Sequence, residues 1–170
     1  MEVKQYSLPK AAFMGLLLLY GISGGLDPQR FWLLNGVDLA FHEFGHLAFG
    51  FLGEFIQFAG GTLMQLLIPI GIAVHFYRRD ERYSAAATLF WIGQNLFNIA
   101  VYVGDARAQV LPLVGGGIHD WAYMLGRLNL LQLDTTLANL LSFLGWVLML
   151  ASVGFGLKFA RHNEEEFLEL

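Results

Sequence analysis

Residues 38–50 read DLAFHEFGHLAFG, a mostly apolar stretch that holds two histidines four positions apart, His42 and His46. Positions i and i+4 lie on the same face of an α-helix, so both imidazoles can reach one metal ion. Glu43 follows the first histidine, which gives the H-E-x-x-H arrangement of zinc hydrolases. Ionisable residues inside a lipid-embedded helix are energetically costly and usually functional. The stretch therefore predicts a membrane helix that carries a Zn²⁺ site, with Glu43 as the general base.

The whole chain has the composition of an integral membrane protein. Its 170 residues are 56% hydrophobic and only 14% charged, whereas soluble domains carry roughly 25% charged residues. The absence of cysteine excludes disulfides and thiolate metal ligands. A net charge of −4 gives no basic surface for nucleic acid. We therefore expect a multi-pass protein of a bacterial-type inner or plasma membrane, whose partners are the lipid bilayer and membrane-protein substrates or partner subunits.

Apolar segments long enough to cross a membrane recur along the chain. A spanning helix needs about 20 apolar residues, with a range of about 17 to 25. The candidate spans are 11–26, 32–52, 61–77, 84–104 and 137–159. We interpret the first as a retained helix rather than a signal peptide, because no A-x-A type cleavage site follows it. The sequence thus predicts a single all-α domain over residues 1–170, a polytopic transmembrane helix bundle of about five to six membrane helices.

The segment 105–136 differs from the spans because it is rich in polar residues. Its glycine run, 115–117, interrupts any helix, and Asp120 is suited to cap a new one. The residues that follow suit an interfacial helix. We therefore expect 105–136 to be a polar, interfacial connection between the last two spans.

Strict alternation of the five spans predicts on which side of the membrane each connection lies. It places the N-terminus, 53–60 and 105–136 on one side, and 27–31, 78–83 and the C-terminus on the other. Counted in this way, four basic residues fall on the first side and six on the second. The positive-inside rule then favours, by this small margin, the second side as cytoplasmic.

A third metal ligand must come from another segment, because a catalytic zinc normally takes three protein ligands and keeps one open position. Asp105, His119 and Asp120 are the candidates. Asp105 is preferred because antiparallel packing of the fourth span on the second brings it level with His46. Instead of binding the metal, Asp120 is also suited to cap a helix, and His119 is also suited to contact the substrate or one of the metal ligands.

Polar side chains on the later spans indicate a water-accessible cleft beside the site. Asn95, Asn98 and Tyr102 follow one face at roughly helical spacing, although hydrogen bonding between helices explains such amides equally well. Gln65, Pro69 and Asn98 are also suited to assist an unwound substrate, since proline loosens a helix and amides pair with an extended strand. A kink and ordinary contacts between helices are the alternatives.

With these residues the chain resembles the site-2 protease group, the intramembrane zinc metalloproteases of the M50 type. The resemblance covers about residues 33–110 and rests on HEFGH in an apolar helix, on the glycine pair 60–61 and on an asparagine-bearing helix that ends at Asp105. It implies a small transmembrane bundle with zinc held by His42, His46 and Asp105. The implied reaction is hydrolysis of a peptide bond in a membrane-embedded substrate, with Glu43 as general base.

The chain also departs from that family. The family pattern near the third ligand is Asn-x-x-Pro and then Leu-Asp-Gly, whereas this chain reads NLFNIAVYVGDARAQ. A second hypothesis is therefore a non-catalytic accessory or structural membrane subunit of a larger complex that retains a metal site. A membrane metalloenzyme acting on a lipid or small molecule is disfavoured, because di-metal oxygenases need more histidines than His75, His119 and His162 supply.

Overall fold

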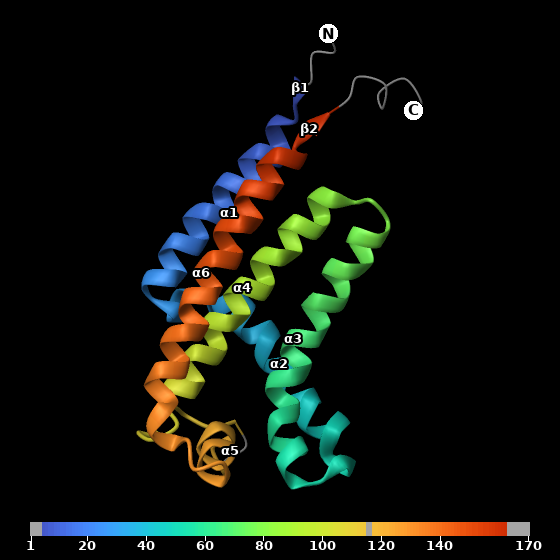
Figure 1. Ribbon diagram of the computed structural model, residues 1–170. Coiled ribbons are helices and arrows are strands. Elements are labelled where there is room, and N and C mark those ends of the chain that lie inside the picture. The colour runs from blue at the N-terminus through green and yellow to red at the C-terminus, as the bar shows by residue number, and fades with distance from the viewer. Residues whose placement is uncertain (1–4, 115–116, 163–170) are drawn as a thin grey trace.

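The computed structural model describes residues 5–114 and 117–162. The described part of the chain forms six α-helices: α1 (Leu8–Leu26), α2 (Trp32–Phe49), α3 (Glu54–Arg78), α4 (Arg82–Gly104), α5 (Asp120–Arg127) and α6 (Asp134–Phe159). Short 3-10 helices connect them: η1 (Pro28–Phe31), η2 (Gly50–Leu52) and η3 (Leu131–Leu133). A two-residue strand, β1 (Gln5–Tyr6), pairs antiparallel with β2 (Arg161–His162). The expected all-α class is confirmed (Figure 1).

Four of the described helices, α1, α3, α4 and α6, are long and apolar enough to cross a membrane. This is fewer than the five to six spans expected from the sequence. Helix α2 is not one of these four candidate membrane helices. The physical reason is its polar content, Asn35, Asp38, His42, Glu43 and His46, which lowers its hydropathy. The four apolar helices are consistent with a membrane protein.

The most extensive contact between helices in the described bundle is that of α4 with α6. Gly93 and Gly145 face each other there, so that a Cβ added to either would lie 2.9 Å from the backbone oxygen of the other. Small residues let helix backbones approach closely. Beside this crossing lies an apolar cluster of buried side chains from η1, α4 and α6, namely Phe31, Phe90, Phe97 and Met149.

The path of the first two helices differs from the expected alternation. β1 pairs with β2, and the Tyr83 hydroxyl donates a hydrogen bond to the Lys10 carbonyl oxygen at 2.8 Å. The start of α1 therefore lies at the same end of the bundle as the α3–α4 turn and the end of α6 (Figure 1). α1 reaches only part of the way along α6, since Gly25 lies against Trp146 near the middle of that helix.

From there η1 redirects the chain, and α2 continues toward the opposite end, where η2 and α5 lie (Figure 1). The prediction that the N-terminus shares a side with 53–60 and 105–136 is wrong. The reason is that α1 and α2 together traverse the bundle once, rather than crossing it twice in opposite directions.

A second apolar cluster fixes α5 beneath the ends of α4 and α6. Its buried members are Ile99, Val103, Ala106 and Leu125. The segment 105–136 therefore contains a short helix that is packed on the bundle, and this packing determines where the first residues of α5 point.

Candidate metal centre

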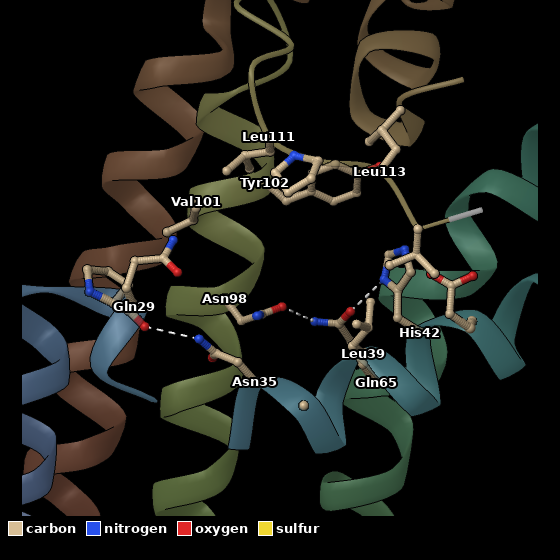
Figure 2. A pocket seen from close by; sticks show the side chains of 15 residues that line it. Gln29, Asn35, Leu39, His42, Gln65, Asn98, Val101, Tyr102, Leu111 and Leu113 are labelled. Atoms are coloured by element: carbon tan, nitrogen blue, oxygen red, sulfur yellow. Dashed lines mark hydrogen bonds between the residues drawn. The ribbon is translucent and has the colours of Figure 1, made fainter. Parts of the chain in front are cut away.

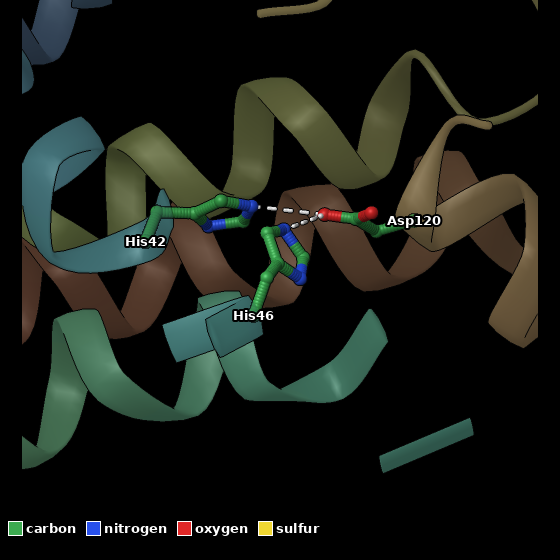
Figure 3. A group of neighbouring side chains, drawn as sticks. All are labelled: His42, His46 and Asp120. Carbon is green, nitrogen blue, oxygen red and sulfur yellow. Dashed lines mark hydrogen bonds and ion pairs between the residues drawn. The ribbon is translucent and has the colours of Figure 1, made fainter. Parts of the chain in front are cut away.

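Two side chains of α2 and one of α5 converge at the end of the bundle where α5 lies (Figure 3). The Nε2 atoms of His42 and His46 lie 2.9 Å and 3.2 Å from Oδ2 of Asp120. The three ligand-type atoms all lie within 4.8 Å of one another. His42 and Asp120 are buried, with 7% and 4% of their surface exposed.

Glycines create the space for this arrangement. Gly45 of α2 and Gly60 of α3 are in backbone contact, which draws the two helices together. A Cβ on the neighbouring Gly61 would lie 2.5 Å from Nε2 of His42. The imidazole therefore occupies the volume that any other residue at position 61 would fill.

The hydrogen bonds of the two imidazoles fix which nitrogen carries hydrogen. Nδ1 of His46 lies 2.8 Å from the carbonyl oxygen of Gln57, which only accepts, so Nδ1 is the donor. Nδ1 of His42 donates to Oε1 of Gln65 at 2.6 Å, since the Gln65 amide nitrogen is already donating elsewhere. In neutral histidines with these tautomers each Nε2 presents a lone pair, as metal-ligating histidines do.

This assignment tests whether the site fits a metal. Three lone-pair-bearing atoms, two Nε2 and one carboxylate oxygen, face one another with no hydrogen between them unless the imidazoles are protonated. Such a group requires positive charge at its centre. Tetrahedral zinc with bonds of about 2.0–2.2 Å holds its ligand atoms roughly 3.3 Å apart, close to the 2.9 Å and 3.2 Å found here. The residues fit a divalent cation.

A chain of buried amides supports His42 from behind. The amide nitrogen of Gln65 donates to Oδ1 of Asn95 at 2.7 Å and to Oδ1 of Asn98 at 3.2 Å, and the second of these bonds is visible in Figure 2. Asn95 in turn donates to Oδ1 of Asp38 at 2.9 Å. Because Gln65, Asn95 and Asp38 are buried and Asn98 is half-buried, their hydrogen bonds hold His42 in one orientation.

Asp120 is positioned by contacts on both sides of α5. Its backbone N–H donates to the Tyr102 hydroxyl at 3.2 Å. His119 is the N-cap of α5 and accepts a hydrogen bond from the Ala122 N–H at 3.3 Å. Burial lowers the pKa of His119, so this side chain is neutral and its Nδ1 is free to accept. The Tyr123 hydroxyl donates to Oε2 of Glu54 at 2.8 Å, which ties α5 to the start of α3.

The structure does not bring Asp105, the expected third ligand, to the histidine pair. Its two carboxylate oxygens accept hydrogen bonds from the backbone N–H groups of Val110 and Leu111 at 3.0 Å and 3.1 Å. Oδ2 also lies 3.3 Å from Nε2 of His119. Asp105 caps the C-terminus of α4, and its side chain turns toward the loop that follows.

Asp120, one of the residues that the sequence left open, takes the position expected for Asp105. The sequence favoured Asp120 as a helix cap, but the cap is His119 and α5 begins at Asp120. This difference of one position frees the Asp120 carboxylate. The signal in the sequence was the pair His119-Asp120 directly after a glycine break.

Two cavities open onto the site, with volumes of about 380 Å³ and 220 Å³. Both are lined by His42, Glu43 and Tyr102, together with Leu113 and Val114 of the loop before α5. Glu43, the expected general base, therefore faces the space beside the histidine pair. The larger cavity continues along α2 toward Asn35 and η1 (Figure 2).

The other residues singled out in the sequence have different surroundings. Gln65 is committed to His42 and to two asparagines, so its amide is not available to an extended substrate. Asn98 lines the larger cavity. Pro69 is buried within an uninterrupted α3. His75 lies near the end of α3 away from the site.

Comparisons with protein-family models, curated proteins and solved structures find no match. The chemistry of His42, His46 and Asp120 is therefore the basis on which a function is proposed.

Proposed function

We propose that the chain is a zinc-dependent intramembrane endopeptidase, in a bacterial-type inner or plasma membrane, that hydrolyses peptide bonds of membrane-embedded substrates. The observation that carries the proposal is the convergence of His42 Nε2, His46 Nε2 and Asp120 Oδ2, with Glu43 beside them. Two imidazoles and one carboxylate form the ligand type of catalytic zinc sites in hydrolases. When bound there, zinc supplies a Lewis acid and lowers the pKa of water to roughly 7.

Glu43 is the residue suited to move protons in this site. It follows His42 on α2 and lines both cavities, so its carboxylate reaches the space next to the ligand group without being one of the three ligands. In the proposed reaction it accepts a proton from the attacking water and passes it to the nitrogen of the broken peptide bond.

The larger cavity has room for a short extended segment of substrate. It follows α2 from Asn35 to Glu43, a rise of about 12 Å at 1.5 Å per residue. That length accommodates roughly four residues of extended chain. Apolar side chains line it, including Leu39, Val101 and Leu111, as an apolar substrate segment requires.

The test measures metal content and hydrolysis on the same purified chain. We expect about one zinc per chain by elemental analysis, and cleavage of quenched fluorescent apolar peptides in detergent micelles. Glu43→Gln should lower cleavage by about 10²–10⁴-fold and leave zinc content and thermal stability unchanged. The matched control is Glu81→Gln, the same change at an exposed residue in the α3–α4 turn, at the end of the bundle away from the site. A chain that holds no zinc under metal-replete conditions would overturn the proposal.

The second candidate function is a non-catalytic membrane subunit that uses the metal site structurally. The burial of His42 and Asp120 favours it, since structural zinc sites are closed. This function predicts a fourth protein or partner ligand and no effect of Glu43→Gln on any activity of the complex. Peptide cleavage by the isolated chain would exclude it.

A further inference from the structure

Tyr102 is a polar residue at the junction of the two cavities, and its one role so far is to accept a hydrogen bond from the Asp120 backbone N–H. It lies on α4, and its ring is 5.8 Å from the His42 ring and 4.2 Å from the His119 ring. Together with His42 and Glu43 it lines both cavities. Tyr102 therefore adjoins the space in which a substrate would meet the metal ligands (Figure 2).

The hydroxyl of Tyr102 has a hydrogen to donate. Its oxygen accepts a hydrogen bond from the backbone N–H of Asp120 at 3.2 Å, and the Asp120 carboxylate also lies within reach of the hydroxyl hydrogen. A phenol has one donor hydrogen in addition to its acceptor lone pairs. The bond from the Asp120 N–H fixes the oxygen beside the ligand group, and the hydrogen is available to a substrate when the Asp120 carboxylate is bound to a metal ion.

We propose that Tyr102 donates a hydrogen bond to the carbonyl oxygen of the bond that is cleaved, as that oxygen gains negative charge; this rests on the proposed peptidase function. The water oxygen bonds to the carbonyl carbon, and Glu43 takes one of the water protons. The carbon–nitrogen bond then breaks, and the nitrogen receives that proton. Tyr102 keeps its own proton throughout. Removing one donor of this kind typically lowers kcat by about 10²–10³-fold.

The test compares Tyr102→Phe with Tyr83→Phe, whose hydroxyl bonds the Lys10 carbonyl oxygen at the far end of the bundle. For Tyr102→Phe we expect kcat to fall by about 10²–10³-fold, while KM changes little. Affinity for a phosphinic dipeptide, which carries a tetrahedral anion, should fall at least tenfold, and zinc affinity should stay within about twofold of wild type. As a second variant, 3-fluorotyrosine at position 102, a more acidic donor, should bind the phosphinic dipeptide more tightly than wild type.

Two results would overturn this proposal. A parallel loss of zinc affinity would make Tyr102 a positioning residue for Asp120, and unchanged phosphinate affinity would remove it from the site. Wild-type protein that binds no zinc would instead overturn the proposed function, and this inference with it.

A separate observation concerns the basic residues, which gather at the end of the bundle away from the metal site. Six lie at the end formed by the start of α1, the α3–α4 turn and the end of α6: Lys10, Arg78, Arg79, Arg82, Lys158 and Arg161. Two, Arg107 and Arg127, lie at the metal-site end. The observed path of α1 increases this asymmetry, because it places Lys10 at the end away from the site.

We infer that the metal-site end faces the extracytoplasmic side of the membrane. Short loops and helix ends rich in lysine and arginine remain in the cytoplasm, and the six-residue cluster marks that end. The site would then take up its metal ion, and release the water-soluble part of its product, outside the cytoplasm. This inference depends on the membrane character of the chain and not on its proposed activity.

The natural absence of cysteine makes the orientation directly measurable. Leu128→Cys introduces a thiol at an exposed position after α5, and Glu81→Cys introduces one in the α3–α4 turn without removing a basic residue. In intact bacterial spheroplasts, a membrane-impermeant maleimide should label Leu128→Cys and should label Glu81→Cys only after permeabilisation. The reverse pattern, or equal labelling of both in intact spheroplasts, would overturn the inference.

Discussion

The bundle consists of two regions that are stabilised in different ways. The packing half, formed by α1, η1, α4 and α6, is held by contacts between rings and glycines around Phe97 and Gly145. The site half, formed by α2, the first turns of α3, α5 and the face of α4 that carries Asn95, is held by hydrogen bonds among buried polar groups such as Gln65 and Asn95. The difference matters because shape complementarity determines stability in the first, while satisfied polar groups determine ligand geometry in the second.

This comparison predicts that substitutions separate by region. Changes in the packing half should alter the free energy of unfolding and leave zinc affinity unchanged. Changes in the site half should alter zinc affinity more than stability. A common pattern of effects in both halves would show that the two regions are one cooperative unit.

The largest effect is expected from Asp120→Asn. This nearly isosteric change removes the charge of the proposed third ligand, and the loss of zinc affinity should exceed the 10–100-fold typical of residues that only support a ligand. Asp105→Asn is the matched control, because Asp105 holds the loop at Val110 and Leu111 and should change zinc affinity little. Competition with a chromophoric chelator measures both. A greater loss for Asp105→Asn would identify Asp105 as the ligand.

These two aspartates also show what sequence could and could not predict. His42, Glu43 and His46 were predictable because their relation depends only on the repeat of one helix. The third ligand depends on where a second segment returns and on the residue at which α5 begins. Whether α5 begins at Asp120 or at the residue after it cannot be read from local pattern, since helix ends are uncertain by one or two residues.

The course of the first helices was equally out of reach of the sequence. The rule that successive spans alternate assumes that each apolar segment crosses the whole membrane. α1 ends beside Trp146, midway along α6, and α2 completes the passage. The cause is the short η1 turn, whose Phe31 is fully buried in the packing half. Such a contact between distant segments leaves no periodic signal in the chain.

The next largest effect is expected from Gly61→Ala, compared with Gly145→Ala. The new methyl at position 61 would lie 2.5 Å from Nε2 of His42 and displace the imidazole, so zinc affinity should fall toward the upper end of a 10–100-fold range. At position 145 it would lie 2.7 Å from Cε2 of Phe97 and 2.9 Å from the oxygen of Gly93. Overpacking there should cost about 1–3 kcal/mol of stability and leave zinc affinity unchanged.

Thermal unfolding and chelator competition, measured on both glycine variants, decide this prediction. If Gly145→Ala weakened zinc binding as much as Gly61→Ala, the separation between the two halves would be incorrect.

A smaller loss is expected from Gln65→Leu. The substitution removes the acceptor for Nδ1 of His42, so the imidazole loses the bond that fixes its tautomer and orientation. Loss of such support typically lowers metal affinity by 10–100-fold, and we expect a value near tenfold because His46 keeps its own bond to Gln57. Asn98→Leu is the control, since it disturbs the same amides but leaves the bond between His42 and Gln65 in place. Equal zinc affinities for the two variants would contradict the supporting role of Gln65.

The smallest effect should come from Tyr123→Phe, which removes the hydroxyl that donates a hydrogen bond to Glu54. An ordinary hydrogen bond contributes about 0.5–1.5 kcal/mol, and exposure of Glu54 to water places this one at the lower end. Because α5 is also held by the packing of Leu125, zinc affinity should fall only about two- to fivefold, less than the factor of ten that 1.4 kcal/mol represents. The variant Glu54→Gln and the double variant complete a mutant cycle for the free energy of zinc binding. A coupling energy below about 0.5 kcal/mol would mean that the Tyr123–Glu54 contact does not hold Asp120 in place. Hydrogen exchange of the α5 amides gives an independent measure, since faster exchange in Tyr123→Phe with unchanged exchange in α4 locates the loosening in the short helix that carries the third ligand.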